Sequence, residues 1–230
     1  MKRFFFPIAA GAVIFLSLSC ATADPAKKYP NMVANVDPVS AGVIEAEFDR
    51  MFSSKLNKVE IEVVFYPRLN AAALEFRHEF LNYRQFWDEA SRKMFADALE
   101  RYKTDYEARN LVNKYNRTRK IYGKTKGRLE WEAFKLAKTR VSSPTIELGY
   151  RFRENSPFFS ANMRSALEEE LGSGEKGTES QRIAMYFTRS QADDLVRLFD
   201  QQYLMGLLGG QDGEKPMEPL VMDEYSEFDD

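Results

Sequence analysis

Two stretches that alternate apolar and charged residues, joined by a short turn, constrain the fold of this chain most strongly. Residues 58–66 and 72–80 both place an apolar side chain at every second position. This alternation predicts strands with one face on a core and the other toward water. Residues 67–70 (Pro-Arg-Leu-Asn) have the composition of a turn. Because the connection is so short, the two strands are expected to pair as an antiparallel hairpin.

Apolar residues at helical spacing predict three helices outside this hairpin. These are residues 38–52, residues 82–109 or 88–109, and residues 190–205. Asp37 and Ser190 stand where N-caps are expected. The first stretch also alternates through Ile44, Ala46 and Phe48, a pattern typical of a strand.

Four more stretches alternate and predict strands: residues 128–138, 145–153, 158–167 and 181–188. The basic connection at residues 110–127, which contains two glycines, is expected to be a long loop. No strand-helix-strand unit repeats, so the sheet should be largely antiparallel. The predicted fold is α+β, with a largely antiparallel sheet of about five or six strands and two long amphipathic helices packed on one face.

The start of the chain has the features of an export signal. Lys2 and Arg3 precede an apolar run at residues 4–18, which is too short for a stable membrane span. The run ends in Leu-Ser-Leu-Ser-Cys at residues 16–20, a segment that resembles the lipobox of bacterial lipoproteins. The resemblance implies that Cys20 is lipidated, becomes the new N-terminus and anchors the domain to a membrane of the cell envelope, at the outer membrane or the periplasmic face.

A second cleavage signal competes with the lipobox. Residues 21–23 (Ala-Thr-Ala) form an A-x-A site, and cleavage after Ala23 would release a soluble periplasmic or secreted protein. The single cysteine of the chain falls at the cleavage junction, which favours the lipoprotein. Lipoprotein acylation supplies more than one hydrocarbon chain, and this is enough for stable anchoring.

Composition indicates one folded domain followed by a charged tail. Hydrophobic residues make up 44% of the 230 residues and charged residues 30%. Without a disulfide the domain depends on an apolar core. The expected organisation is a signal peptide at 1–19, a lipid-tether linker at 20–37, one α+β domain at 38–210 and a disordered acidic tail at 211–230. The tail holds eight acidic residues against one lysine.

A basic segment at residues 114–128 contains no acidic residue and is the candidate binding site for an anionic surface. Its basic residues are Lys114, Arg117, Arg119, Lys120, Lys124, Lys126 and Arg128. Such a segment can bind nucleic acid, anionic lipid headgroups at about 1 kcal/mol per basic residue, or the acidic tail of the same chain. It can also be a solvated loop. A net charge of −2 and the export signal argue against nucleic acid.

Candidate catalytic residues are few. His78, the single histidine, alternates with aromatic residues and is expected to be half-buried in the core. Glu130 and Glu132 share one face of a predicted strand beside Trp131, a pair that could cleave a glycan or simply face solvent opposite basic residues. The chain has no recognisable zinc, nucleotide or nucleophile motif. We therefore expect no enzymatic activity, no metal and no cofactor.

Two main functions follow from these observations. The first is a lipid-anchored, non-enzymatic binding or scaffold domain of the bacterial cell envelope, with the membrane and another envelope protein or lipid as partners. The second is a carrier that encloses an apolar ligand such as a lipid between sheet and helices. A glycan hydrolase that uses Glu130 and Glu132 is a remote third.

Overall fold

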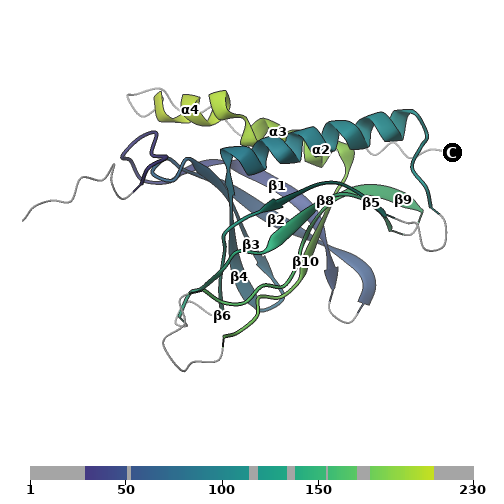
Figure 1. The fold of residues 1–230 in the computed structure, drawn as a ribbon, viewed down its shortest axis with the longest axis horizontal. Helices are drawn as coiled ribbons and strands as arrows, with labels where there is room; N and C mark the ends of the chain where they lie inside the picture. The colour runs from purple at the N-terminus through teal and green to yellow at the C-terminus, as the bar shows by residue number, and fades with distance from the viewer. Residues whose placement is uncertain are drawn as a thin grey trace, which may run out of the picture.

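A ten-stranded antiparallel sheet dominates the fold, and helices lie across one of its ends (Figure 1). The computed structural model describes residues 29–50, 53–113, 119–133, 138–153, 155–169 and 177–209. The prediction of a sheet of five or six strands covered by two long helices is wrong. In the described residues the sheet has ten strands, and more residues lie in strands than in helices. The predicted antiparallel pairing is confirmed.

The first four strands follow one another as hairpins. They are β1 (Val39–Arg50), β2 (Ser53–Tyr66), β3 (Ala71–His78) and β4 (Leu81–Asp88). The predicted hairpin is β2–β3, in which Ile61 lies opposite Phe76. Its turn ends at Asn70, which has a φ of 48° and is one of the residue types that tolerate this left-handed conformation.

The prediction of a helix at residues 38–52 is wrong, because this segment is strand β1. Ile44, Ala46 and Phe48 are buried on one face, while Val43 and Glu45 on the other face are exposed. Either a helix or a strand could bury these three residues. The segment forms a strand because it pairs with β2 along nearly its whole length.

Six further strands lie in the described residues from 119 onward. They are β5 (Arg119–Lys126), β6 (Leu129–Ala133), β7 (Arg140–Ser142), β8 (Thr145–Arg153), β9 (Ser156–Met163) and β10 (Ile183–Phe187). The strand predicted at 145–153 is confirmed to the residue. The strand predicted at 128–138 is β6 in its first part, and those predicted at 158–167 and 181–188 correspond to β9 and β10.

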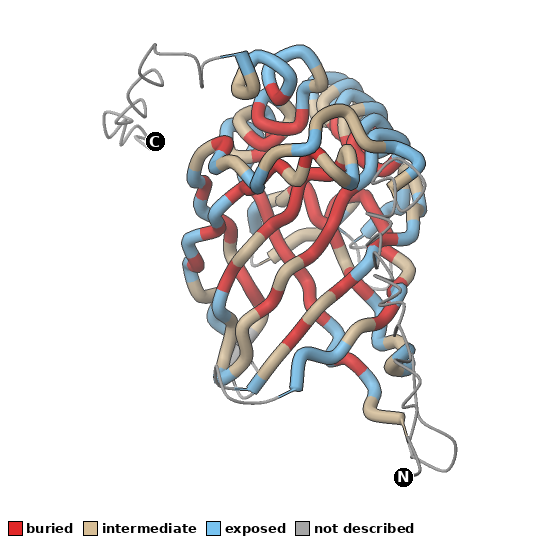
Figure 2. Tube along the Cα trace, turned by 90° about the vertical axis from the view of Figure 1, so that its left-hand side faces the viewer, coloured by how far each residue is buried: buried red, intermediate tan, exposed pale blue. Residues whose placement is uncertain are grey.

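The sheet is curled, so that β5 at one end and β6 near the other end come close at one corner. Its order is β5-β8-β9-β10-β1-β2-β3-β4-β6-β7, yet only Gly127 and Arg128 separate β5 from β6 along the chain. Phe86 N–H donates to the Arg128 carbonyl at 2.8 Å, and Gly127 N–H donates to the Pro144 carbonyl at 3.3 Å. The sheet therefore has an enclosed inner face and an outer face, and buried and exposed positions alternate along its strands (Figure 2).

In the part of the chain that the structure describes, three helices close one end of the curled sheet. They are α2 (Glu89–Glu107), α3 (Arg189–Phe199) and α4 (Gln201–Gly209). The Asp88 carboxylate caps α2 by accepting from Ser91 N–H at 2.8 Å, so the helix start at residue 88 is right and the start at 82 is wrong. Thr188 and Gln191 form a capping box at α3, so Ser190 is not the cap.

Aromatic side chains fill the space between the helices and the inner face. Phe95 of α2 contacts the rings of Phe159, Phe187 and Phe199 at centroid distances of 5.1 to 6.0 Å. Trp87 packs on Phe95 at 5.7 Å. All five side chains are buried. These rings lie between the sheet and the helices, the region where the carrier hypothesis places an apolar ligand.

Candidate anion-binding surface

The predicted basic loop is, in its described part, strand β5. Lys114 and Arg117 lie outside the described residues, and Arg119 to Lys126 pair with β8 from Arg151 to Thr145. The loop prediction failed because this strand is polar on its outer side and its apolar period is broken by a bulge between Ile121 and Gly123. The basic residues are thereby fixed to one edge of the curled sheet.

The strand sends its basic residues to two different faces. Lys120 points toward α2, where its Nζ lies 2.6 Å from Asp105 Oδ2. The hydrogen bonds from Lys120 and Tyr122 lower the pKa of Asp105. Arg119, Lys124 and Lys126 belong to the outer side, and Arg128 pairs with Glu130 at 2.8 Å next to β6.

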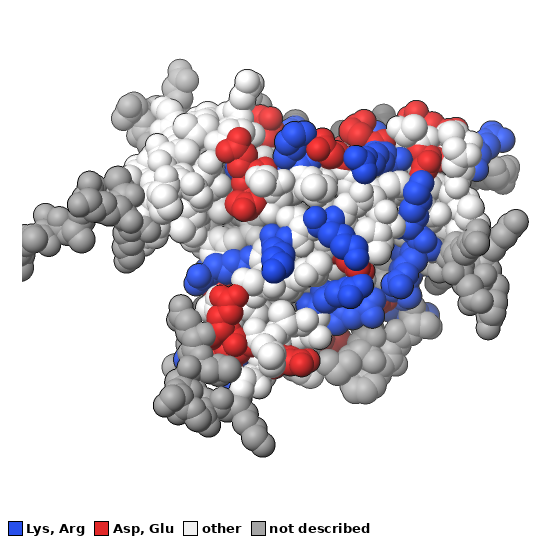
Figure 3. Space-filling model, viewed as in Figure 1, with Lys and Arg blue, Asp and Glu red and all other residues white. Residues whose placement is uncertain are grey.

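Neighbouring strands add basic residues to the same outer side. We call this set the outer basic face: Arg119, Lys124, Lys126, Arg151, Arg164 and Arg182. Figure 3 shows that Lys and Arg side chains gather over the region of β5 and β8, with few acidic groups between them. The basic segment of the sequence is therefore one part of a larger surface built from several strands.

Glu147 of β8 is the acidic residue most enclosed by this face. Its side chain is only 4% exposed, and it accepts hydrogen bonds from Lys124 at 3.1 Å and from Arg164. Burial by itself would raise the pKa of Glu147, but these two cationic donors outweigh it, and the pKa is lowered. Glu147 is thus a carboxylate that two of the six basic residues neutralise.

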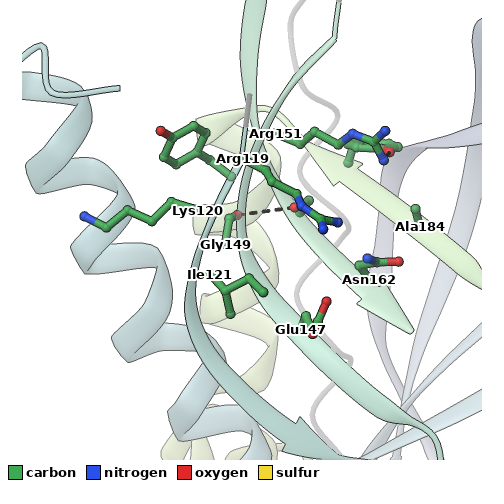
Figure 4. Close-up of a pocket in the computed structure, with 11 residues that line it drawn as sticks. Arg119, Lys120, Ile121, Glu147, Gly149, Arg151, Asn162 and Ala184 are labelled. Carbon is green, nitrogen blue, oxygen red and sulfur yellow. Dashed lines mark hydrogen bonds between the residues drawn. The ribbon is translucent and has the colours of Figure 1, made fainter. Parts of the chain in front are cut away.

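A shallow hollow lies in the middle of the outer basic face (Figure 4). Its floor consists of the small residues Gly149, Ser160 and Ala184, which come from three adjacent strands. Side chains of Arg119 and Arg151 stand at its rim. Asn162, Tyr186 and Glu147 also line it, together with Lys120, Ile121 and Tyr150.

Gly149 is required where the bulge of β5 approaches β8. A Cβ atom at this position would lie 1.9 Å from the Lys120 carbonyl oxygen and 3.0 Å from Ile121 Cα. Since both are backbone atoms, no rotation of a side chain can relieve the clash. The absence of a side chain at residue 149 both permits the pairing of β5 with β8 and leaves the floor of the hollow open.

Arg151 is held in place by a tyrosine rather than by a carboxylate. Its Nη1 donates to the Tyr186 hydroxyl at 3.1 Å, and this hydroxyl donates to Asp49 Oδ2 at 2.8 Å. Burial, and next the hydrogen bond to Asp49, raise the pKa of Tyr186 to about 12, so the hydroxyl stays protonated. Asp49 itself pairs with Arg153 at 2.6 Å, which leaves Arg151 without an acidic partner in the described part of the chain.

The candidate catalytic pair does not come together as a site. Glu130 lies on the outer side of β6, where Arg84 Nη1 at 3.2 Å and Arg128 Nη2 at 2.8 Å pair with it. Glu132 accepts a hydrogen bond from Thr139 at 3.3 Å. Trp131 is buried on the opposite, inner face. Trp131, on which a sugar ring could pack, is therefore on the other side of the sheet from the two carboxylates.

His78 lies at the end of β3 among core aromatics, as its sequence pattern predicts. It is half-buried, and the centroid of its ring lies 5.0 Å from that of the Phe48 ring, with the two rings tilted. Burial lowers the pKa of His78, while Glu79 and Asp49 act in the opposite direction. Within the ranges that the structure describes, no group of three or more His, Cys, Asp or Glu side chains is arranged to hold a metal ion.

Sequence reasoning missed the residues that complete the hollow. Arg151, Ser160 and Asn162 were present in predicted strands, but their meaning depends on which strands are neighbours. The order of β5, β8, β9 and β10 is set by tertiary packing. One usable signal was that Arg151 falls on the polar side of the strand predicted at 145–153.

Two comparisons with known proteins find relatives, and no solved structure matches the chain. An uncharacterized protein of Treponema pallidum (strain Nichols) is 22% identical over 181 residues. The alignment covers 77% of this chain and 63% of that relative, so the chain spans less than two thirds of its length. A family described as uncharacterised Treponema protein matches residues 39–206, from the first residue of β1 into α4. Because this match covers most of the chain, the protein belongs to that Treponema family.

Proposed function

We propose that this protein is a non-enzymatic binding domain of the bacterial cell envelope that holds its outer basic face against an anionic membrane surface. The observation that carries the proposal is the gathering of six basic residues from neighbouring strands on one side of the curled sheet. Among the residues that the structure describes, the enclosed acid on this face is Glu147, which Lys124 and Arg164 contact. Near an anionic bilayer each basic residue contributes about 1 kcal/mol, so several acting together give useful affinity.

The N-terminal export signal supports a location next to such a surface. Acylation at Cys20, which lies outside the described residues, would tether the domain to a bilayer and raise the local concentration of headgroups. None of the helices in the described ranges has the length and apolar character needed to cross a membrane. Anchoring is tested by palmitate labelling in cells. Label that disappears with Cys20→Ala supports it, and label that persists contradicts it.

Vesicle binding tests the role of the outer basic face. The full chain carrying Cys20→Ala, which removes the acylation site, is sedimented with phosphatidylglycerol-containing vesicles. Lys126→Glu together with Arg182→Glu should lower the partition coefficient by roughly tenfold or more, since two favourable charges become unfavourable ones. Both residues lie outside the helices and the core, so the fold should persist.

A variant of equal net charge provides the control. Lys58 of β2 and Lys93 of α2 are exposed and lie outside the outer basic face. Lys58→Glu with Lys93→Glu should leave vesicle binding nearly unchanged. Equal losses in the two double variants would mean that binding follows net charge alone, and the proposed role of this face would be wrong.

A further inference from the structure

We propose that the hollow between Arg119 and Arg151 is a discrete site for one oxyanion of the phosphate type. This deepens the proposed function, and it rests on that function only in taking the membrane as one source of phosphate. Within the described residues, the hollow combines two guanidinium groups that have no carboxylate partner, neutral donors, and a floor without large side chains.

The two arginines are directly opposite each other on paired strands. Arg119 of β5 and Arg151 of β8 are register partners, and both side chains lie on the outer side (Figure 4). Like charges at directly opposed positions destabilise a sheet. In the described part of the chain neither guanidinium pairs with a carboxylate. A bound anion between them would turn this repulsion into two favourable contacts.

Other arginines on the outer surface contact a carboxylate, whereas Arg182 contacts the Asn162 amide. Arg84 contacts Glu75 at 2.7 Å, Arg153 contacts Asp49 at 2.6 Å, and Arg164 contacts Glu147. Each of these guanidinium groups is matched by a carboxylate of the same chain. The planar donor fork of arginine fits the oxygens of a phosphate as well as those of a carboxylate, so an unmatched pair favours a phosphate ligand from outside.

Neutral groups in the hollow provide further donors. Asn162 accepts from Arg182 Nε through its Oδ1 at 3.1 Å, which directs its amide nitrogen away as a donor. The Ser160 hydroxyl donates a long hydrogen bond of 3.5 Å to the Gly149 carbonyl. Tyr186 is already committed as a donor to Asp49, so its role is to orient Arg151. Arg119, Arg151, Ser160 and Asn162 are therefore the proposed ligand-binding residues.

One carboxylate, that of Glu147, also lines the hollow and lowers its net positive charge. Glu147 is held by Lys124 and Arg164, and its local charge is thereby more than compensated. The floor of the hollow is formed by Gly149, Ser160 and Ala184, none of which carries a large side chain. The phosphate of a lipid headgroup and free phosphate share this chemistry, and the experiment distinguishes them.

Calorimetric titration with inorganic phosphate tests the site in the full chain carrying Cys20→Ala. Arg119→Gln should weaken phosphate binding by roughly tenfold, equivalent to about 1.4 kcal/mol. Ala184→Leu should weaken it similarly without any change of charge, because the added side chain fills the hollow. The matched control is Lys126→Gln, which removes one charge from the same strand outside the hollow and should change the affinity by less than about threefold.

The result that overturns the inference is an equal effect of Arg119→Gln and Lys126→Gln with none from Ala184→Leu. That outcome would mean diffuse attraction to the basic surface. The absence of any phosphate binding would also overturn the inference, because no site would then exist. Since Arg119 is exposed, Arg119→Gln keeps the fold even if Ala184→Leu does not. Thermal unfolding of each variant verifies this.

Vesicles separate this inference from the proposed function. Phosphate binding that depends on the hollow supports the site even if no vesicle binds, and it then identifies free phosphate as the source. Competition between phosphate and phosphatidylglycerol vesicles, lost in Ala184→Leu, identifies a lipid headgroup. Vesicle binding that needs Lys126 and Arg182 while phosphate fails to bind would leave the proposed function standing and remove the site.

Discussion

At the scale of single residues, Gly149 decides whether the outer face can form. Gly149→Ala is expected to destabilise the protein by about 2 kcal/mol or more, as overpacking does where only backbone can move. The reason is the 1.9 Å separation that a Cβ atom would have from the Lys120 carbonyl oxygen. Urea unfolding measures the loss.

Gly206 of α4 provides the control, because an added Cβ there meets no atom within 4 Å. Gly206→Ala should leave the free energy of unfolding unchanged or raise it by up to about 1 kcal/mol, the helix preference of alanine over glycine. If Gly149→Ala is as harmless as Gly206→Ala, the close approach of β5 to β8 is wrong.

His78 is expected to make stability depend on pH near neutrality. Burial lowers its folded-state pKa below the ordinary value of 6.5, so the unfolded chain binds this proton more readily. Its stabilising contribution is therefore complete above the unfolded pKa and is lost as the pH falls below it. The free energy of unfolding should decrease between about pH 7.5 and pH 5.5, the range in which an ordinary histidine titrates.

Replacement by glutamine tests this assignment, since the chain has one histidine. His78→Gln should flatten the decrease in the free energy of unfolding over the same pH range. An unchanged pH profile in that variant would assign the decrease to another group.

At the scale of secondary-structure elements, the capping box of α3 gives a clear prediction. Thr188 accepts from Gln191 N–H at 3.3 Å, and the Gln191 side chain accepts from Thr188 N–H at 2.9 Å. Thr188→Ala should cost about 1 kcal/mol of stability. Ser190→Ala, at the position that the sequence suggested as the cap, should be nearly neutral. A larger loss from Ser190→Ala in thermal unfolding would contradict the helix start.

Which elements could be predicted depended on how much each one buries. β2, β3 and β8 alternate cleanly because one face of each packs on the core, and all three were predicted. β5 exposes most of its residues and carries a bulge, so its pattern resembled a loop. β1 satisfied helical and alternating spacing at once, and only pairing with β2 distinguishes the two.

Only part of the candidate site could be predicted from the sequence. The basic segment of the sequence supplied Arg119, Lys124 and Lys126, but its Lys120 turned to α2 and Arg128 to Glu130. Arg151 could not be joined to Arg119 without the register of β5 on β8. A surface made by four strands is a property of the sheet order, which local sequence patterns do not contain.

At the scale of the whole molecule, the acidic tail at residues 211–230 is expected to compete for the outer basic face. It lies outside the described residues and carries eight acidic residues and one lysine. Because a tethered segment meets its target often, deleting it should raise the affinity for anionic vesicles, more strongly at low than at high ionic strength. Sedimentation at two salt concentrations measures this. Unchanged affinity at both would exclude the tail as a competitor.

The central claim is that the outer face of β5, β8, β9 and β10 binds an anion at one defined place. Amide chemical shifts of the isotopically labelled protein, followed during titration with inorganic phosphate, test it most directly. The largest changes should fall at Arg119, Gly149, Arg151, Ser160 and Asn162, and saturate together. Changes spread over all basic residues without saturation, or confined to other parts of the sheet, would contradict the account.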